Sequence, residues 1–164
     1  MKANYTVPYR RKREGRTDYK KRLSLLKSRK TRLVIRKTNT QILIQFTDYN
    51  PDGDQVKISL NSSSLKKEGW KGSFNNLPAA YLAGYKAGLL AKQKGIKEAV
   101  LDKGLQIHLK GSRIYACLKG VVDAGIKTPA SPSIYPSEDR LKGKHISDDY
   151  EKKIEDVKKK IEGK

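Results

Sequence analysis

The chain has 164 residues, of which 37 are Lys or Arg and 17 are Asp or Glu, so its formal net charge is +20. This length predicts one domain of ordinary size with tails. A membrane-spanning helix needs about 20 consecutive apolar residues, and every apolar stretch of this sequence is much shorter. One cysteine, Cys117, and two distant histidines exclude an internal disulfide and a zinc site made of cysteines and histidines alone.

Residues 1–37 carry most of the excess charge, with fifteen Lys or Arg, two acids and a net charge of +13. Such a basic block favours a nucleic-acid partner over a surface that is only soluble. In the arm formed by residues 1–16, arginines suit phosphate oxygens and tyrosines can stack on bases. Pro8 and Gly15 are expected to break any helix before residue 17, so we expect the arm to be disordered alone and ordered on its target. A localisation signal is the alternative, but it leaves the tyrosines unexplained.

An amphipathic helix is predicted to start after Thr17 or Asp18, because Tyr19, Leu23 and Leu26 recur on one stripe. The rest of its surface is strongly basic.

Three strands follow, because apolar and polar residues alternate. In the first strand, Leu33 and Ile35 share one face, and Arg32 and Arg36 lie on the other. Short links of turn-forming residues favour an antiparallel meander. The predicted strands are Thr31–Lys37, Gln41–Asp48 and Gln55–Leu60.

After a polar loop, an Ala- and Leu-rich helix is predicted over Leu77–Lys94. Its N-cap is Asn76 if Pro78 takes the second helical position, and the following residue if Pro78 takes the first. Gly84 and Gly88, one turn apart, are expected to let this helix approach the sheet closely.

A short buried strand is predicted over Glu98–Asp102, parallel to its neighbour after the helical crossover. Residues 104–110 extend its edge or form a loop. Ser112 caps a further helix that ends near Gly125. Cys117 lies in the middle of that helix, where we expect a buried structural thiol and not a nucleophile.

Three prolines predict an extended segment at residues 128–137. The last helix is predicted from Ser147 to about Glu162, and its charge pairing indicates a solvated helix with a thin apolar stripe. The element order predicts an α/β fold whose mixed sheet contains an antiparallel three-strand meander joined by crossover helices. The predicted units are a basic arm at 1–16, an α/β globular domain at 17–127, and an extended Pro-rich segment with a C-terminal helix at 128–164.

This element order resembles half of the RNase H-like architecture, so a nuclease has to be considered. Two-metal hydrolysis requires carboxylates that converge from the first strand, the next helix and the fourth strand. Here the first strand carries arginines, the helix Leu77–Lys94 contains no acid, and Asp102 ends the fourth strand alone. No phosphate-binding glycine loop is present, and His108 is interpreted as a surface or core histidine and not as a base. We therefore expect no enzymatic activity, no metal and no cofactor.

Three stretches are specific beyond their composition: YRRKREGRTDYKKRLSLLKSRKTRLVIRKTNTQILIQF, NNLPAAYLAGYKAGLLAKQKGIKEAVLD and KGSRIYACLKGVVDAGIKTPASPSIYPSEDRLKGKHI. They resemble the archaeal and eukaryotic branch of the ribosomal large-subunit protein eighteen family, known as protein five in eukaryotes. The resemblance covers roughly residues 5–146. It implies a protein that binds 5S rRNA in the central protuberance of the large subunit, with a non-catalytic α/β fold related to the RNase H-like motif.

The resemblance also implies which residues bind RNA. The arm and first helix contribute Tyr9, Arg10, Arg11, Lys12, Arg13, Arg16, Tyr19, Lys20, Arg22, Lys27, Arg29 and Lys30. A Lys-Gly-Ser-Arg element at a helix start, suited to a phosphate, contributes Lys110, Gly111, Ser112 and Arg113. A late basic element contributes Arg140, Lys142, Lys144 and His145. Arg32 of the first strand completes the predicted set. The loop Leu105–Leu109 departs from the family pattern because it is more apolar.

We therefore expect a structural constituent of the large ribosomal subunit that binds 5S rRNA and large-subunit rRNA beside neighbouring ribosomal proteins. The N-terminus turns basic where a signal peptide would continue with apolar residues, so a cytoplasmic location is expected, with no membrane or small-molecule substrate as partner. Two alternatives stay open. One is a general DNA-binding or chromatin-like protein, and the other, less favoured, is an RNase H-like nuclease.

Overall fold

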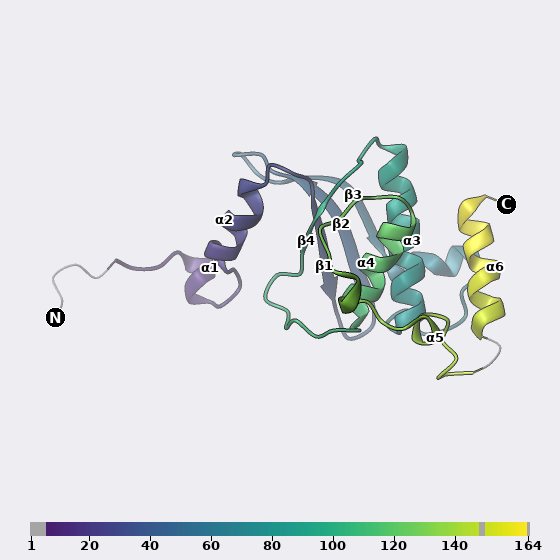
Figure 1. Ribbon diagram of the computed structural model, residues 1–164. Coiled ribbons are helices and arrows are strands. Elements are labelled where there is room, and N and C mark those ends of the chain that lie inside the picture. Colours follow the sequence, from purple (N-terminus) through teal and green to yellow (C-terminus); the bar gives the residue numbers. More distant parts are fainter. Residues whose placement is uncertain (1–5, 148–149, 164) are drawn as a thin grey trace.

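The computed structural model describes residues 6–147 and 150–163. A four-stranded mixed sheet with strand order β3-β2-β1-β4 lies at its centre (Figure 1). The first three strands form the predicted antiparallel meander, and the fourth pairs in parallel with the first. The predicted α/β fold with a mixed sheet is therefore confirmed, whereas the RNase H-like relationship stays a prediction. The strands are β1 (Arg32–Lys37), β2 (Ile42–Asp48), β3 (Gln55–Asn61) and β4 (Val100–Asp102).

Alternation of apolar and polar residues places one side of each meander strand in the core. Leu33 and Ile35 of β1 pair with Phe46 and Ile44 of β2, and all four side chains are fully buried. Because the alternation extends along each strand, the three meander strands begin and end within one residue of their predicted positions.

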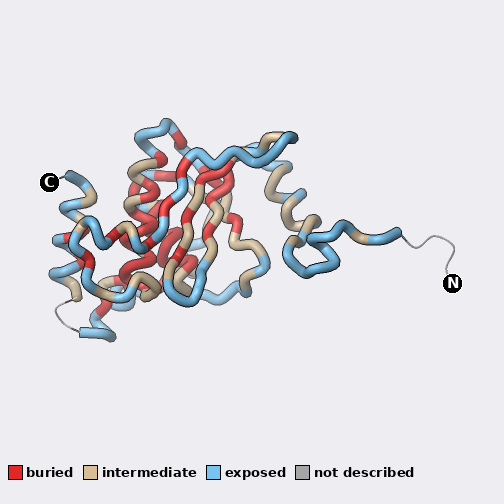
Figure 2. Tube along the Cα trace, turned by 180° about the vertical axis from the view of Figure 1, so that it is seen from behind, coloured by how far each residue is buried: buried red, intermediate tan, exposed pale blue. Residues whose placement is uncertain are grey.

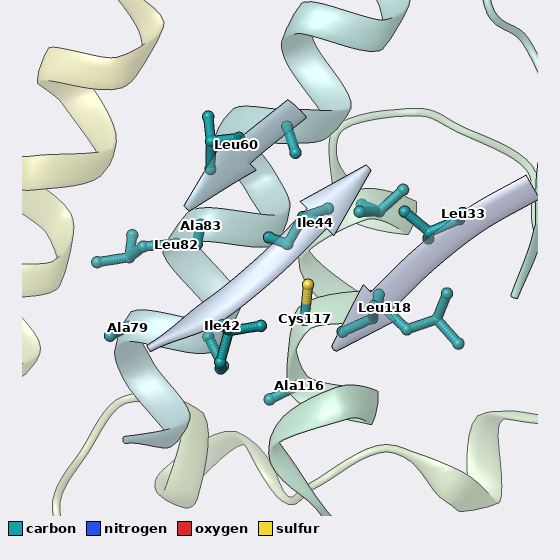
Figure 3. Packing of buried hydrophobic residues seen from close by; sticks show 14 of the residues in the cluster. Leu33, Ile42, Ile44, Leu60, Ala79, Leu82, Ala83, Ala116, Cys117 and Leu118 are labelled. Carbon is teal, nitrogen blue, oxygen red and sulfur yellow. The ribbon is translucent and has the colours of Figure 1, made fainter. Parts of the chain in front are cut away.

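Two long helices, α3 (Leu77–Gln93) and α4 (Arg113–Asp123), cover one face of this sheet (Figure 1). Asn76 is the N-cap of α3, because its side chain accepts a hydrogen bond from the N–H of Ala79 at 2.9 Å. Small and aliphatic side chains of both helices meet those of the sheet in a common hydrophobic core (Figure 3).

The helices α3 and α4 come close together at glycines. A Cβ atom on Gly84 would lie 2.1 Å from the carbonyl oxygen of Cys117, and one on Gly120 would lie 2.2 Å from that of Tyr81. No side chain fits against backbone at such a distance. The expectation that Gly84 and Gly88 approach the sheet is wrong, since both lie against α4. Glycine spacing identifies a face for close packing but not the partner.

Cys117 is fully buried in the middle of α4, and burial raises the pKa of its thiol. The reactive thiolate is therefore disfavoured. We expect the native protein to resist thiol reagents. Cys117→Ala should lower the free energy of unfolding by about 1 kcal/mol, the cost of a small buried side chain, and leave nucleic-acid affinity unchanged. Labelling kinetics and denaturant unfolding measure the two effects, and rapid labelling of the native protein would contradict the structural role.

Short helical turns form in two segments where none was predicted. The polar loop after β3 contains the 3₁₀ helix η1 (Ser62–Glu68), which buries Leu65. The Pro-rich segment contains the 3₁₀ turn η2 (Pro132–Ile134) and is followed by α5 (Glu138–Leu141). The prediction of a purely extended segment is therefore wrong, because a proline at the first position of a helical turn loses no needed donor.

The C-terminal helix α6 (Tyr150–Glu162) is docked on the domain. Ile154 and Val157 are buried, and the helix contacts α3 and η1. Tyr85 of α3 donates a hydrogen bond to a Glu162 carboxylate oxygen at 2.6 Å. The interpretation of this helix as solvated is therefore wrong, because its apolar stripe completes the core. The helix was predicted from Ser147, but residues 148–149 lie outside the described part of the chain. The division into three units stays a prediction.

The basic N-terminal segment forms two helices at the end of the molecule opposite α6, and much of this segment is exposed (Figures 1 and 2). They are α1 (Arg10–Arg13) and α2 (Tyr19–Lys27). The first contradicts the expectation that Pro8 and Gly15 exclude a helix here. Pro8 precedes the N-cap, where a missing N–H costs nothing, and Gly15 follows the helix end. The second begins after Asp18 as predicted.

Candidate nucleic-acid interface

A groove of about 370 Å³ lies between the two N-terminal helices and the end of β4. Five basic side chains and two carboxylates line it. Such an excess of positive charge in a concave surface attracts anions. The structure thus brings three predicted residues, Arg11, Arg16 and Arg22, together around one space. The basic lining residues are Arg11, Arg16, Lys21, Arg22 and Arg36.

Two of these basic side chains fix α2 to the domain. Arg22 donates from Nη2 to both carboxylate oxygens of Asp54, at 2.9 and 3.0 Å. Lys21 Nζ donates to the backbone carbonyl of Gly104 at 2.9 Å. The helix α2, which forms one side of the groove, is therefore held both just before β3 and just after β4.

Arg32 does not belong to an exposed surface. Its side chain is 3% exposed, with Nη2 lying 2.6 Å from Asp54 Oδ2 and Nη1 lying 3.3 Å from Asp102 Oδ2. A phosphate cannot reach a guanidinium buried between two carboxylates, so its assignment as an RNA-binding residue is corrected. Arg32 is a structural residue that holds the strand ends and, through Asp54, the helix α2 together.

Lys21 and Arg36 are the basic groove residues that the predicted set lacks. Arg36 lies four residues after Arg32 on the same face of β1, lines the groove, and is 36% exposed. Its Nη2 donates to Asp102 Oδ1 at 3.0 Å. Strand alternation could have identified Arg36 from the sequence, because that pattern places Arg36 with Arg32 on the face away from the core.

Asp102 is the shared acceptor of this network and is 8% exposed. Burial alone would raise the pKa of Asp102, but the charge of Arg36, the N–H of Gly104 and the charge of Arg32 together hold it below its usual value. The pKa of Asp54 is also lowered, because the Arg22 and Arg32 hydrogen bonds outweigh its burial.

These pKa shifts predict how stability depends on pH. A carboxylate whose pKa is lower in the folded state stabilises the protein above its unfolded pKa of about 3.9, and this stabilisation is lost as pH falls through the folded pKa. We expect the free energy of unfolding to decrease as pH falls below about 4. Urea unfolding between pH 7 and 2.5 measures this. A variant without the Asp102 carboxylate should show a weaker decrease, and an identical pH profile would contradict the assignment.

The rest of the predicted arm and helix faces solvent. Tyr9 is 75% exposed, and its ring lies 5.4 Å from that of Tyr19 at an angle of 48°. This leaves the outer side of Tyr9 open to a base. The exposed basic residues of the predicted set, apart from the groove residues, are Arg10, Lys12, Arg13, Lys20, Lys27, Arg29 and Lys30.

A second groove, of about 800 Å³, brings the Lys-Gly-Ser-Arg element next to the late basic element. Arg113, at the first position of α4, donates from Nη1 to the carbonyl of Asn75 at 2.9 Å. Lys110 is exposed just before the groove. The predicted residues that line this groove are Gly111, Ser112, Arg113, Arg140 and His145.

Two residues of the late basic element, Lys142 and Lys144, line neither groove. Lys142 Nζ pairs with Glu151 at 2.7 Å, and Lys144 Nζ pairs with Asp139 at 2.9 Å. These contacts raise the pKa of each lysine. Both lysines are thus used in ion pairs of the C-terminal region.

The two grooves adjoin each other, because Leu105 and Gln106 line both. The basic surface therefore continues from the arm, past the end of β4, to the start of α4. Within residues 6–147 and 150–163, no helix is long and apolar enough to cross a membrane. In the same residues, no three His, Cys, Asp or Glu side chains are grouped so that they could hold a metal ion.

Comparison with known proteins shows the family of the chain. The family model of ribosomal large subunit proteins 60S L5 and 50S L18 matches residues 3–97. The large ribosomal subunit protein uL18 of Korarchaeum cryptofilum is 53% identical over 150 residues, which cover 92% of this chain and 77% of that protein. The chain belongs to the L18 family. The uL18 protein of Sulfurisphaera tokodaii is 49% identical over 153 residues, which cover 93% of this chain and 77% of that protein.

The L18 family match covers residues 3–97, which include α1, α2, the meander and α3. The basic residues that α1 and α2 contribute to the first groove therefore lie within the matched segment. Similarity to the two uL18 proteins extends over at least 150 residues, more than this segment contains. It therefore reaches into the part of the chain that forms the second groove. The family resemblance inferred from the sequence motifs is confirmed.

Proposed function

We propose that this chain is a structural constituent of the large ribosomal subunit that binds 5S rRNA and helps to attach it to the large-subunit rRNA in the central protuberance. Its relatives are named as proteins of the large ribosomal subunit. The observation that carries the RNA-binding part is the pair of adjoining basic grooves, with the basic arm at one end. Such a surface suits RNA, which proteins hold mainly through phosphates, 2′-hydroxyls and shape.

Each groove has its own proposed contacts. In the first, Arg11 and Arg16 bind phosphates, and Arg22 and Arg36 contribute charge while they stay paired with carboxylates. In the second, Arg113 and its neighbours bind a phosphate at the start of α4, where helix N–H groups favour an anion. The exposed ring of Tyr9 stacks on an unpaired base.

The nuclease alternative lacks its carboxylates. Asp102 is the acid that ends the fourth strand, and it is occupied by Arg32 and Arg36. A general DNA-binding protein would use the same basic surface without a preference for folded RNA. The three functions therefore differ in two measurable properties, which are selectivity for RNA and cleavage in the presence of Mg²⁺.

A gel-shift titration separates these functions. The chain is titrated against 5S rRNA and against duplex DNA of similar length at one salt concentration, with and without Mg²⁺. The proposed function predicts tighter binding to 5S rRNA and intact RNA in every lane. Equal affinity for DNA would favour the general DNA-binding protein, and Mg²⁺-dependent cleavage would favour the nuclease.

Arg113 tests whether RNA is held at a fixed site. Its guanidinium geometry is constrained by the bond to the carbonyl of Asn75, and lysine cannot reproduce a planar fork. We expect Arg113→Lys to weaken 5S rRNA binding measurably, and Arg113→Ala to cost about 1–3 kcal/mol of binding free energy. Binding titrations measure both. The control is Lys159→Ala, an exposed lysine on α6, which should cost almost nothing. Equal losses of RNA affinity at both positions would mean that the RNA is held by the overall positive charge of the protein and not at a fixed site.

A further inference from the structure

The loop between β4 and α4 exposes its apolar residues. Leu105, Ile107 and Leu109 are 56%, 86% and 66% exposed. The polar residues between them hold the loop to the domain: Gln106 donates from Nε2 to the carbonyl of Lys37 at 3.3 Å, and the His108 ring contacts the Tyr115 hydroxyl. An ordinary loop buries its apolar residues and exposes its polar ones. Here, three large aliphatic side chains within five residues are presented to solvent.

This presentation is built into the fold. The N–H of Ser112 donates to the carbonyl of Leu109 at 3.2 Å, and the N–H of Gly111 donates to the carbonyl of Ile134 at 2.9 Å. At the other end, the N–H of Gln106 donates to the carbonyl of Lys103 at 3.3 Å. Because both ends and the two polar side chains are held, the aliphatic side chains form a preorganised surface. Contiguous exposed apolar surface of this kind marks interaction sites in soluble proteins.

The second groove, on which this loop lies, carries one sign of charge. Of the thirteen residues that line the second groove, none is acidic, and Lys37, Arg113 and Arg140 are basic. A second copy of this chain would bring the same basic rim against it and be repelled. The complementary partner is therefore negatively charged around an apolar centre.

RNA provides the negative charge but not the apolar centre. Its accessible surfaces are phosphates, 2′-hydroxyls and base edges, and unpaired bases are held by aromatic rings or by guanidinium groups. Aliphatic side chains offer none of these contacts, and they would remove water from the polar groups of RNA without replacing its hydrogen bonds. A protein surface with aliphatic or aromatic side chains flanked by Asp and Glu supplies both properties.

We propose that residues 105–109 are a docking site for another protein of the large subunit, whose contacting segment is apolar and acidic. Ile107, the most exposed of the three, is its central contact. Lys37 of the second groove, which is exposed and is not one of the proposed RNA contacts, pairs with the partner's carboxylates. This inference rests on the proposed function, because it takes the chain to be assembled in the large subunit.

Photo-crosslinking in assembled subunits tests this directly. Benzoylphenylalanine replaces Ile107 in the full chain, large subunits that contain the variant are purified by sedimentation, and crosslinked products are identified by mass spectrometry. The matched control carries the same group at Val56, an aliphatic residue of the edge strand β3 that is 49% exposed. We expect position 107 to crosslink to a protein segment with apolar residues and net negative charge, and position 56 not to crosslink to that segment.

The outcomes are distinguishable. If the chain is absent from large subunits, the proposed function fails, and this inference fails with it. If the chain is present but position 107 crosslinks to rRNA, to a basic segment, to a second copy or to nothing, only the docking site is overturned. The double variant Ile107→Ser, Leu109→Ser gives an independent measurement. It should keep its 5S rRNA affinity within about twofold, and a tenfold loss would show that the loop contacts RNA.

Discussion

Replacing Asp102 by asparagine is expected to lower the free energy of unfolding by about 1–3 kcal/mol, because it removes one of the two carboxylates that pair with the buried guanidinium of Arg32, while Asp54 still pairs with it. Asparagine keeps the size of the side chain, so the loss reports charge and not a cavity. Urea unfolding at pH 7 measures it, and circular dichroism checks that the variant is folded before denaturant is added.

The control for this variant is Asp52→Asn, in the exposed turn between β2 and β3. It removes the same charge from an exposed site that forms no ion pair with any of the described residues, and it should change stability by less than about 0.5 kcal/mol. Similar losses in the two variants would mean that the effect comes from the overall charge of the protein. The ion pairs around Asp102 would then contribute no specific stabilisation.

Deleting residues 1–16 is expected to flatten the salt dependence of 5S rRNA binding. If the full chain neutralises on the order of 6–10 phosphates, its affinity should fall by roughly 10³-fold or more between 50 and 200 mM salt. The deletion removes Arg11 and Arg16 of the first groove together with three other bases of the described arm. Each lost phosphate contact lowers the slope of log affinity against log salt by about 0.7–0.9. Titrations at four salt concentrations give this slope.

The truncated domain should stay folded, because α1 buries no residue. Its thermal unfolding is measured beside the binding. The matched control removes charge at the far end of the molecule by replacing Lys152 and Lys159, both exposed on α6, with alanine. That variant should keep the salt slope of the full chain. An unchanged slope in the truncated protein would remove the arm from the RNA interface.

Local patterns predicted the elements well, because strand alternation and helix capping depend on neighbouring residues. Whether a face of a helix or strand is buried or exposed depends, in contrast, on residues that lie far away in the sequence. The alternation turns Arg32 away from Leu33, and Arg32 was predicted to bind RNA, yet its side chain is buried beside Asp102, which is 70 positions later. No local signal reports that contact. The same reason explains α6, whose apolar stripe was recognised but whose docking on α3 depends on residues such as Tyr85.

The candidate site divides in the same way. Exposed basic residues of the arm and α2 could be predicted, since charge density alone places them at the surface. The grooves could not, because they arise where Arg36 of β1 and residues 104–106 meet the helices, and where Arg140 comes beside Arg113. Lys142 and Lys144 lie outside the grooves, where Lys142 pairs with Glu151 and Lys144 pairs with Asp139, and these pairs form only when the chain folds.

The helices α1 and α2 lie at the opposite end of the molecule from α6 (Figures 1 and 2), and the two ends of the sequence differ greatly in charge. Residues 1–37 have a net charge of +13, whereas residues 138–164 have a net charge of +1. The protein is therefore a strong electric dipole. In the field of a polyanion it experiences a torque that turns the arm forward before any contact is made, so encounters begin in a productive orientation. Assembly should therefore be fast at low ionic strength, and the nearly neutral end is left facing outward.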